Sequence, residues 1–275
     1  MDVISVLPQP AGHCHYNKDM HKDTVNRLLA LNQVFYETFG GAFAATRRRL
    51  QPGIQRVLEQ LQPQGDWLDL GCGSGTLAAA WVQAGYGALY TGLDFSESLL
   101  REARKAVAEA VNALLSAGSV PQPDFFLVDL LQPGWEMAFN PAGFTGVLSF
   151  AVLHHIPGSH NRQHLLTAVK HLLKPGGTFI FSVWQFQHSP RLMARLQPWQ
   201  LAGLDETELE PGDSLLDWRH ALPGQAEQSG LRYVHLFNRQ ELADLAATTG
   251  FKLVDEFESD GKGGRLALYQ TWQSL

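Results

Sequence analysis

The stretch DWLDLGCGSGTLAAA, residues 66–80, decides the fold of this chain. A short apolar run ends at Asp69, glycines alternate at Gly71, Gly73 and Gly75, and an alanine-rich segment follows. A strand, a glycine turn and a helix in this order are typical of an open α/β sheet, whose ligands bind beyond the carboxyl ends of the strands. Glycines permit positive φ and let a ligand touch backbone N–H groups, so the stretch predicts a small-molecule site.

Strand and helix patterns alternate through the rest of the chain. Strands are predicted at 67–70, 89–93, 125–128, 147–150 and 178–183, with helical periodicity between them. Residues 251–257 and 266–272 predict a closing antiparallel pair, after a helix capped by Asn238. This alternation predicts an α/β fold with a doubly wound, mostly parallel seven-stranded sheet covered on both faces.

Further segments flank and interrupt this pattern. Residues 1–20 show no periodicity and are expected to form a loose leader, whereas 21–275 are expected to form a single domain. Its first helix is predicted over 25–39, with an interruption at Gly40, and its second over 54–61. Residues 185–230 break the rhythm and predict an insertion after the fifth strand, either a lid-like cover of the site or a satellite core.

Composition excludes several classes of protein. The 275 residues are 45% hydrophobic and 17% charged with a net charge of −6, which is typical of a globular chain without general nucleic-acid affinity. Cys14 and Cys72 cannot build a disulfide framework. The sequence shows neither a signal-peptide pattern nor an apolar run of membrane-spanning length. We therefore expect a cytoplasmic protein with no membrane partner.

Acids at the strand ends distinguish between two ligands. Residues 73–78 fit the dinucleotide pattern G-x-G-x-x-G/A, but Asp69 would repel a pyrophosphate and suits the ammonium and sulfonium of S-adenosylmethionine. Asp94 closes the second strand, where it can accept both ribose hydroxyls. Asp129 closes the third, where it can meet the adenine amino group beside Leu130. The alternative is that Asp94 and Asp129 are only turn or helix-start acids.

The segments LDLGCGSG, GLDFSE, VDL, SFAVLHHI and LLKPGGTFIFSVW resemble, in order, those of class I S-adenosylmethionine-dependent methyltransferases over residues 50–185. The resemblance implies a Rossmann-like methyltransferase fold, S-adenosylmethionine as cofactor and methyl transfer as the reaction. It also implies that Ser149 and Ala151, at the fourth strand end, border the methyl-transfer site. The candidate cofactor-binding residues are Asp69, Gly71, Cys72, Gly73, Gly75, Asp94, Phe95, Asp129, Leu130, Ser149 and Ala151.

A closer resemblance is to the group that methylates the carboxymethyl carboxylate of the tRNA wobble uridine. It rests on FYETFGGAFAATRRRLQPG, SFAVLHHIPGSHNRQHLL and LRYVHLFNRQELADLAATTGF. It implies a tRNA acceptor and, as for some of those enzymes, a small activator subunit that binds zinc. Residues 185–230 match that group poorly and the chain is acidic, so a small-molecule O-, N- or C-methyltransferase is the alternative.

Four side chains from these segments are candidates for catalysis. A carboxylate acceptor needs no general base, whereas a phenol, amine or carbon acceptor would take one from His154 or His155. The alternative is that one histidine packs under its loop. Arg47 is placed to grip a phosphate or an acceptor carboxylate. The catalytic candidates are Tyr36, Arg47, His154 and His155.

The remaining basic residues have a simpler interpretation. Arg48 and Arg49 are expected on a solvated surface. His160, His164 and His171 share a helix flank without a cysteine or acid at ligand spacing, so no metal site is predicted. Two further functions stay open at this level: a nicotinamide-dependent oxidoreductase, and a module that binds the cofactor without catalysis.

Overall fold

The computed structural model describes residues 20–45, 49–114, 120–220 and 228–275, so the predicted leader lies almost wholly outside the described part of the chain. The described helices are α1 Lys22–Ala45, α2 Pro52–Gln60, α3 Thr76–Gln83, α4 Glu97–Ala113, α5 Ser159–Leu172, α6 Pro190–Met193 and α7 Arg239–Thr248. The strands are β1 Asp66–Leu70, β2 Leu89–Asp94, β3 Asp124–Leu127, β4 Phe144–Phe150, β5 Leu173–Trp184, β6 Leu196–Gln197, β7 Asp213–His220, β8 Gln228–His235, β9 Phe251–Ser259 and β10 Ala267–Ser274.

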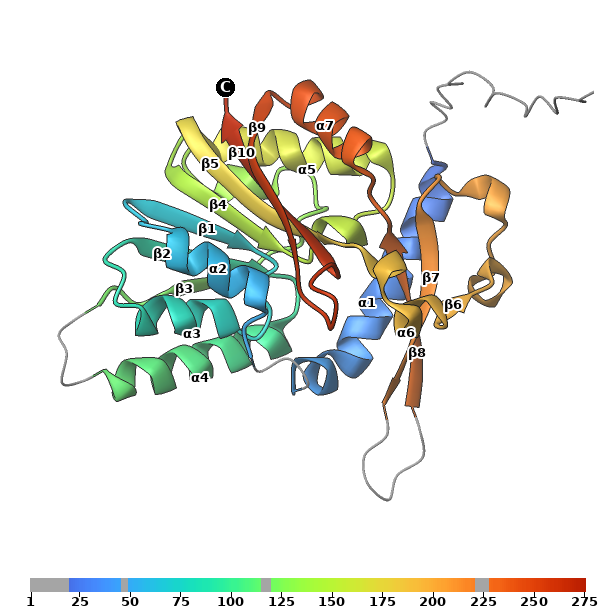
Figure 1. Ribbon diagram of the computed structural model, residues 1–275, viewed down its shortest axis with the longest axis horizontal. Helices are drawn as coiled ribbons and strands as arrows, with labels where there is room; N and C mark the ends of the chain where they lie inside the picture. Colours follow the sequence, from blue (N-terminus) through green and yellow to red (C-terminus); the bar gives the residue numbers. More distant parts are fainter. Residues whose placement is uncertain (1–19, 46–48, 115–119, 221–227) are drawn as a thin grey trace, which may run out of the picture.

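Seven of these strands form one twisted sheet in the order β3-β2-β1-β4-β5-β10-β9 (Figure 1). The strands β1 to β5 pair in parallel, and β10 pairs antiparallel with both β5 and β9. The predicted doubly wound, mostly parallel sheet is therefore confirmed, including the antiparallel pair that closes it. The strand order reverses between β1 and β4, where open α/β sheets bind their ligands.

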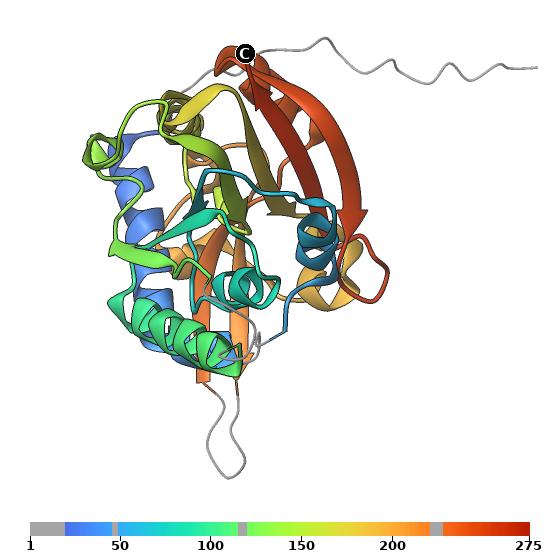
Figure 2. The same ribbon diagram turned by 90° about the vertical axis from the view of Figure 1, so that its left-hand side faces the viewer.

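Side chains alternate along each strand, and both faces of the sheet are covered by helices (Figure 2). In β1, Leu68 and Leu70 are buried on the face covered by α5 and α7. Trp67 lies on the opposite face, which α2, α3 and α4 cover. Ser96 caps α4 and Asn238 caps α7, each accepting a backbone N–H three residues on, as predicted. These helices fix the strand ends that carry the predicted acids.

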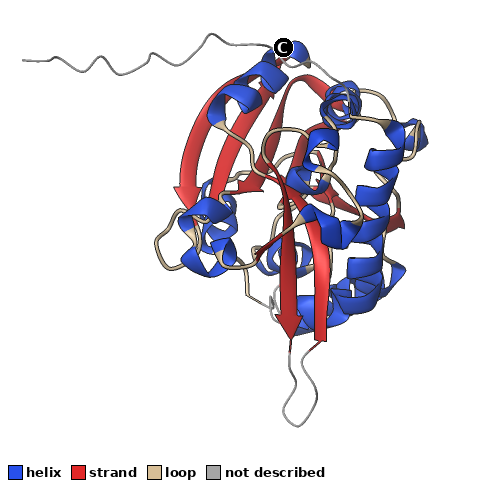
Figure 3. Cartoon of the chain, turned by 90° about the vertical axis from the view of Figure 1, so that its right-hand side faces the viewer, coloured by secondary structure: helices blue, strands red, loops and turns tan. Residues whose placement is uncertain are grey.

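The helix α1 runs unbroken to Ala45, so the predicted interruption at Gly40 is wrong. A glycine costs a helix about 1 kcal/mol, which tertiary packing readily offsets. Here α1 packs on a second, three-stranded sheet, β6-β7-β8, and Leu28 meets Trp199, Leu215 and Tyr233 in the core between them (Figure 3). This sheet occupies the predicted insertion and continues past residue 230, to the end of β8.

No described helix is both long and apolar enough to cross a membrane.

The cores of the two sheets adjoin. Trp184 and Phe186, at and after the end of β5, pack against Leu216 and Val234 of the small sheet. The insertion is thus packed onto the carboxyl edge of the main sheet, next to the reversal of strand order.

Candidate active site

A cavity of about 540 Å³ lies at the carboxyl ends of the parallel strands, where the strand order reverses. Its walls come from the glycine turn after β1, from the ends of β2, β4 and β5, from α1, and from the turn between β9 and β10. The structure brings together nine of the predicted cofactor residues in this lining, namely Asp69, Gly71, Cys72, Gly73, Asp94, Phe95, Asp129, Leu130 and Ala151.

The three glycines of the turn have positive φ, but only one faces open space. A Cβ on Gly71 would lie 2.4 Å from a methyl of Val152, and one on Gly75 would lie 2.6 Å from the Cα of Ala103 in α4. A Cβ on Gly73 would meet nothing within 4 Å. Gly73 therefore lets a ligand approach the backbone, whereas Gly75 is outside the lining and permits close packing of α3 on α4.

Two buried carboxylates face the cavity, and within the described residues neither takes part in an ion pair. Asp69 accepts a hydrogen bond from the Tyr90 hydroxyl, and burial raises the pKa of Asp69 to about 7. Asp94 accepts from the N–H groups of Gly73 and Ser96, both at 2.9 Å, and burial also raises its pKa. The positive charge of a cationic ligand would balance these carboxylates, and a vicinal diol on the same ligand would donate hydrogen bonds to one of them.

Other predicted cofactor residues differ in how they reach the cavity. Asp129 is exposed at the rim and accepts a hydrogen bond from the N–H of Leu131 at 2.9 Å. Cys72 is buried, which raises the pKa of its thiol far above the usual value and keeps the thiol protonated. Ser149 is buried in β4 and does not line the cavity. Because Phe150 lines it, strand alternation turns Ser149 to the other face of the sheet.

The cavity lining also includes two of the catalytic candidates, Tyr36 and His155, and the Tyr36 ring packs on the Phe95 ring at 5.9 Å. The Tyr36 hydroxyl lies 2.9 Å from Nε2 of His155, and Nδ1 of His155 lies 3.1 Å from the carbonyl oxygen of Tyr233. A carbonyl oxygen can only accept, so Nδ1 carries the hydrogen. In the neutral ring, Nε2 then accepts a hydrogen bond from the Tyr36 hydroxyl. Arg47 lies outside the described residues. Arg49, expected on a solvated surface, is exposed and also borders the cavity.

His154 and His155 have different surroundings. His154 is fully buried and stacks on the Trp184 ring, with 5.0 Å between the ring centroids. Its Nδ1 accepts a hydrogen bond from the backbone N–H of Trp184 at 3.4 Å. His154 lies outside the cavity lining, so its proposed contact with the acceptor is not supported. The alternative interpretation, a histidine packed under the loop, describes it.

Sequence reasoning missed several residues of the lining. Asp260 stands in the β9–β10 turn with φ +70°, and its carboxylate accepts from the Gly53 N–H at 2.9 Å and the Tyr269 hydroxyl at 2.7 Å. Asn32 comes from α1. Only the glycine-rich sequence after Asp260 signalled a turn, and no local pattern signalled Asn32.

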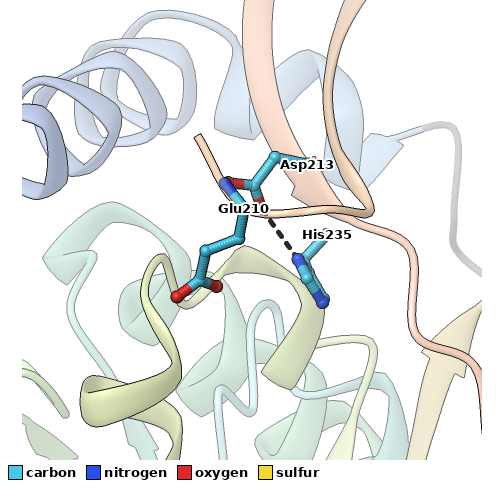
Figure 4. Close-up of side chains that lie close together, drawn as sticks. All are labelled: Glu210, Asp213 and His235. Atoms are coloured by element: carbon cyan, nitrogen blue, oxygen red, sulfur yellow. Dashed lines mark hydrogen bonds and ion pairs between the residues drawn. The ribbon is translucent and has the colours of Figure 1, made fainter. Parts of the chain in front are cut away.

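A second polar cluster lies in the insertion. Glu210, Asp213 and His235 approach one another within 4.8 Å, close enough for a metal site that sequence spacing did not predict (Figure 4). However, Nδ1 of His235 already bonds Asp213 at 2.7 Å and Nε2 bonds Glu241 at 2.8 Å, and Arg162 pairs with Glu210 at 2.5 Å. Burial lowers the pKa of His235, but these hydrogen bonds raise it overall. The cluster is therefore a neutralising ion network.

The reversed strand order, the open Gly73 backbone and the buried acids Asp69 and Asp94 define a class I S-adenosylmethionine-dependent methyltransferase. The residues present fit that cofactor, which supplies the methyl group when bound. A family model described as a methyltransferase domain matches residues 43–256, and the chain belongs to this family.

Relatives with both types of acceptor resemble the chain. It is 28% identical over 225 residues to a methyltransferase-like protein of Encephalitozoon cuniculi, covering 80% of this chain and 87% of that one. It is 26% identical to the tRNA (carboxymethyluridine(34)-5-O)-methyltransferase of Arabidopsis thaliana, over 54% of this chain and only 31% of that enzyme. It is 29% identical to a ubiquinone biosynthesis O-methyltransferase of Xylella fastidiosa, over 64% and 68% of the two chains.

Solved structures share the fold. An S-adenosylmethionine-dependent methyltransferase of Methanosarcina mazei superposes with a TM-score of 0.58 at 21% identity, covering 82% of this chain and 98% of that one. The glycopeptide N-methyltransferase MtfA, solved with S-adenosylmethionine, superposes with a TM-score of 0.55 at 18% identity, covering 80% and 85%.

Proposed function

We propose that the protein methylates a carboxylate on a modified wobble uridine of tRNA. One observation carries the proposal: the three sequence segments that resemble the tRNA-modifying group converge at one end of the cavity. Tyr36 comes from the first, His155 from the second and Tyr233 from the third, and two hydrogen bonds join them. The Arabidopsis relative supports this class of acceptor. Tyr233 lies in β8, just past the predicted lid-like insertion 185–230, and contributes its peptide group.

In this proposal the chain binds and orients, because a carboxylate acceptor needs no general base. Asp69 and Asp94 hold the cofactor, and Arg49 attracts the anionic acceptor at the rim. Tyr36 and His155, joined by a hydrogen bond, position the acceptor carboxylate for in-line transfer.

The test uses labelled-methyl S-adenosylmethionine and purified protein with bulk tRNA or a metabolite extract. Label in tRNA that mild alkali releases supports a methyl ester on the wobble uridine. Asp94→Ala should lose this labelling together with cofactor affinity. Label only in metabolites would overturn the tRNA acceptor. No label in either, with cofactor bound, would point to a required activator subunit or to a non-catalytic module.

A small-molecule hydroxyl acceptor is the second candidate. The side chains of Ile54, Phe150, Trp184 and Leu266 give the cavity an apolar wall suited to a hydrophobic ring, and the Xylella relative is an O-methyltransferase.

A further inference from the structure

Asn32 of α1 connects three parts of the molecule beneath the acceptor end of the cavity. Its side chain is buried and lines the cavity. Nδ2 donates to the carbonyl oxygen of Tyr233 at 3.2 Å and to that of His155 at 3.4 Å, and Oδ1 accepts from the Tyr233 N–H at 2.8 Å. The Asn32 amide therefore forms hydrogen bonds with both the backbone N–H and the carbonyl of Tyr233 in β8. It also bonds the loop that carries His155.

The same carbonyl oxygen of Tyr233 determines which nitrogen of His155 carries hydrogen in the neutral ring. It accepts from Asn32 and, at 3.1 Å, from Nδ1 of His155, and a carbonyl oxygen has two lone pairs for these two donors. With Nδ1 donating to this carbonyl, Nε2 is the nitrogen that faces the Tyr36 hydroxyl, at 2.9 Å. His154, at 4.3 Å between ring centroids, and Trp184, at 6.1 Å, also pack against His155.

We propose that Asn32 is a positioning residue for methyl transfer. By holding the Tyr233 peptide group, it keeps His155 in the Nδ1–H tautomer and keeps Nε2 in hydrogen-bonding distance of the Tyr36 hydroxyl. The inference rests on the proposed function only in placing the acceptor beside Tyr36. It applies to a carboxylate or a hydroxyl acceptor, because both use the same nitrogen.

The test compares two substitutions with a matched control. Asn32→Asp keeps the shape and the acceptor atom but removes the donor to Tyr233, and Asn32→Ala removes both. Asn161→Ala is the control, because Asn161 also donates to a backbone carbonyl, that of Pro157 at 2.9 Å, yet lies outside the cavity lining. All proteins are examined with full chains and shown to bind S-adenosylmethionine by calorimetry.

The first readout is the ¹⁵N spectrum of the His155 imidazole, which needs no acceptor. We expect the Nδ1–H tautomer in the wild-type protein and in Asn161→Ala, and a mixture of tautomers in both Asn32 variants. The second is turnover with tRNA, where kcat should fall about tenfold and the KM for S-adenosylmethionine should stay unchanged, with a shifted pH profile.

Two results would overturn the proposal. One is an Nε2–H tautomer in the wild-type protein, which stands as a test even where a variant fails to fold. The other is an unchanged His155 spectrum in a folded Asn32 variant. Failure of the proposed acceptor is distinguishable, because it abolishes tRNA labelling in the wild-type protein while leaving the spectra as expected.

Discussion

Two groups of buried acids in this molecule have opposite electrostatic surroundings. At the carboxyl ends of β1 and β2, Asp69 and Asp94 line one cavity, and within the described residues no ion pair reaches them. In the insertion, Glu210 and Asp213 lie beside Arg162 and His235, at 2.5 Å and 2.7 Å. Both groups remove carboxylates from water, but only the second supplies its own cations.

The pKa shifts follow this difference. Burial raises the pKa of Asp69 to about 7. Burial also acts on Glu210, but the Arg162 guanidinium and hydrogen bonds outweigh it and lower its pKa. A buried carboxylate without a counter-charge costs folding free energy, and a chain retains such a cost at sites that a ligand completes. The comparison thus separates a ligand site from a structural one, although both show clustered acids.

The largest effect is expected from removing the cation of the structural group. Arg162→Met removes the counter-charge of the largely buried Glu210 and should lower the free energy of unfolding by about 3–5 kcal/mol. Urea denaturation measures it. Arg104→Met, which breaks a surface pair with Glu97, is the control and should cost less than about 0.5 kcal/mol. Equal costs for the two variants would contradict the assignment of Arg162.

The acids at the cavity should respond in the opposite way, because removing a charge there should stabilise the fold. Asp69→Asn should weaken S-adenosylmethionine binding about 100-fold, because a charge-assisted contact is lost. The same substitution should raise the unfolding free energy of the cofactor-free protein at pH 8 by about 1–3 kcal/mol, since the amide keeps an acceptor for Tyr90 without burying a charge. Calorimetry and urea denaturation measure the two quantities. Lower stability with unchanged affinity would refute our interpretation of Asp69.

The titration of Asp69 gives a third, smaller effect. With a pKa of about 7 in the free protein, Asp69 must lose its proton before it can pair with a cation. The Kd for S-adenosylmethionine should therefore rise about tenfold as the pH falls from 7.5 to 6. Calorimetry across this range checks it, and Asp69→Asn should show a flat profile. A flat profile for the wild-type protein would mean that Asp69 does not face the cofactor charge.

Local sequence patterns predicted nine residues that the structure brings together in one cavity lining, for a physical reason. The loop after β1 and the strand-end acids Asp69, Asp94 and Asp129 are set by strand phase and turn chemistry within a few residues. Strand alternation also explains why Ser149, one position out of step with the lining residue Phe150, lies outside the cavity lining. Similarly, adjacent positions send His154 into the core and His155 into the cavity.

The acceptor end and the ion network could not be predicted in this way. They join side chains from distant segments, such as Asn32 with Tyr233 and Arg162 with Glu241, and no local periodicity encodes such pairs. The continuity of α1 through Gly40 has the same origin, because packing on β8 outweighs local propensity.

The smallest effect concerns His235, whose pKa the hydrogen bonds to Asp213 and Glu241 raise against the effect of burial. A raised folded-state pKa contributes stability that is fully present below the unfolded value of about 6.5 and is lost as pH rises through the folded value. Asp69 acts in a lower window, between about 4 and 7, so the measurement is made in an Asp69→Asn background. There, the free energy of unfolding should decline with pH above about 6.5, and His235→Gln should flatten the decline. A decline that persists in the double variant would assign this pH dependence to another group and leave the network without a protonated histidine.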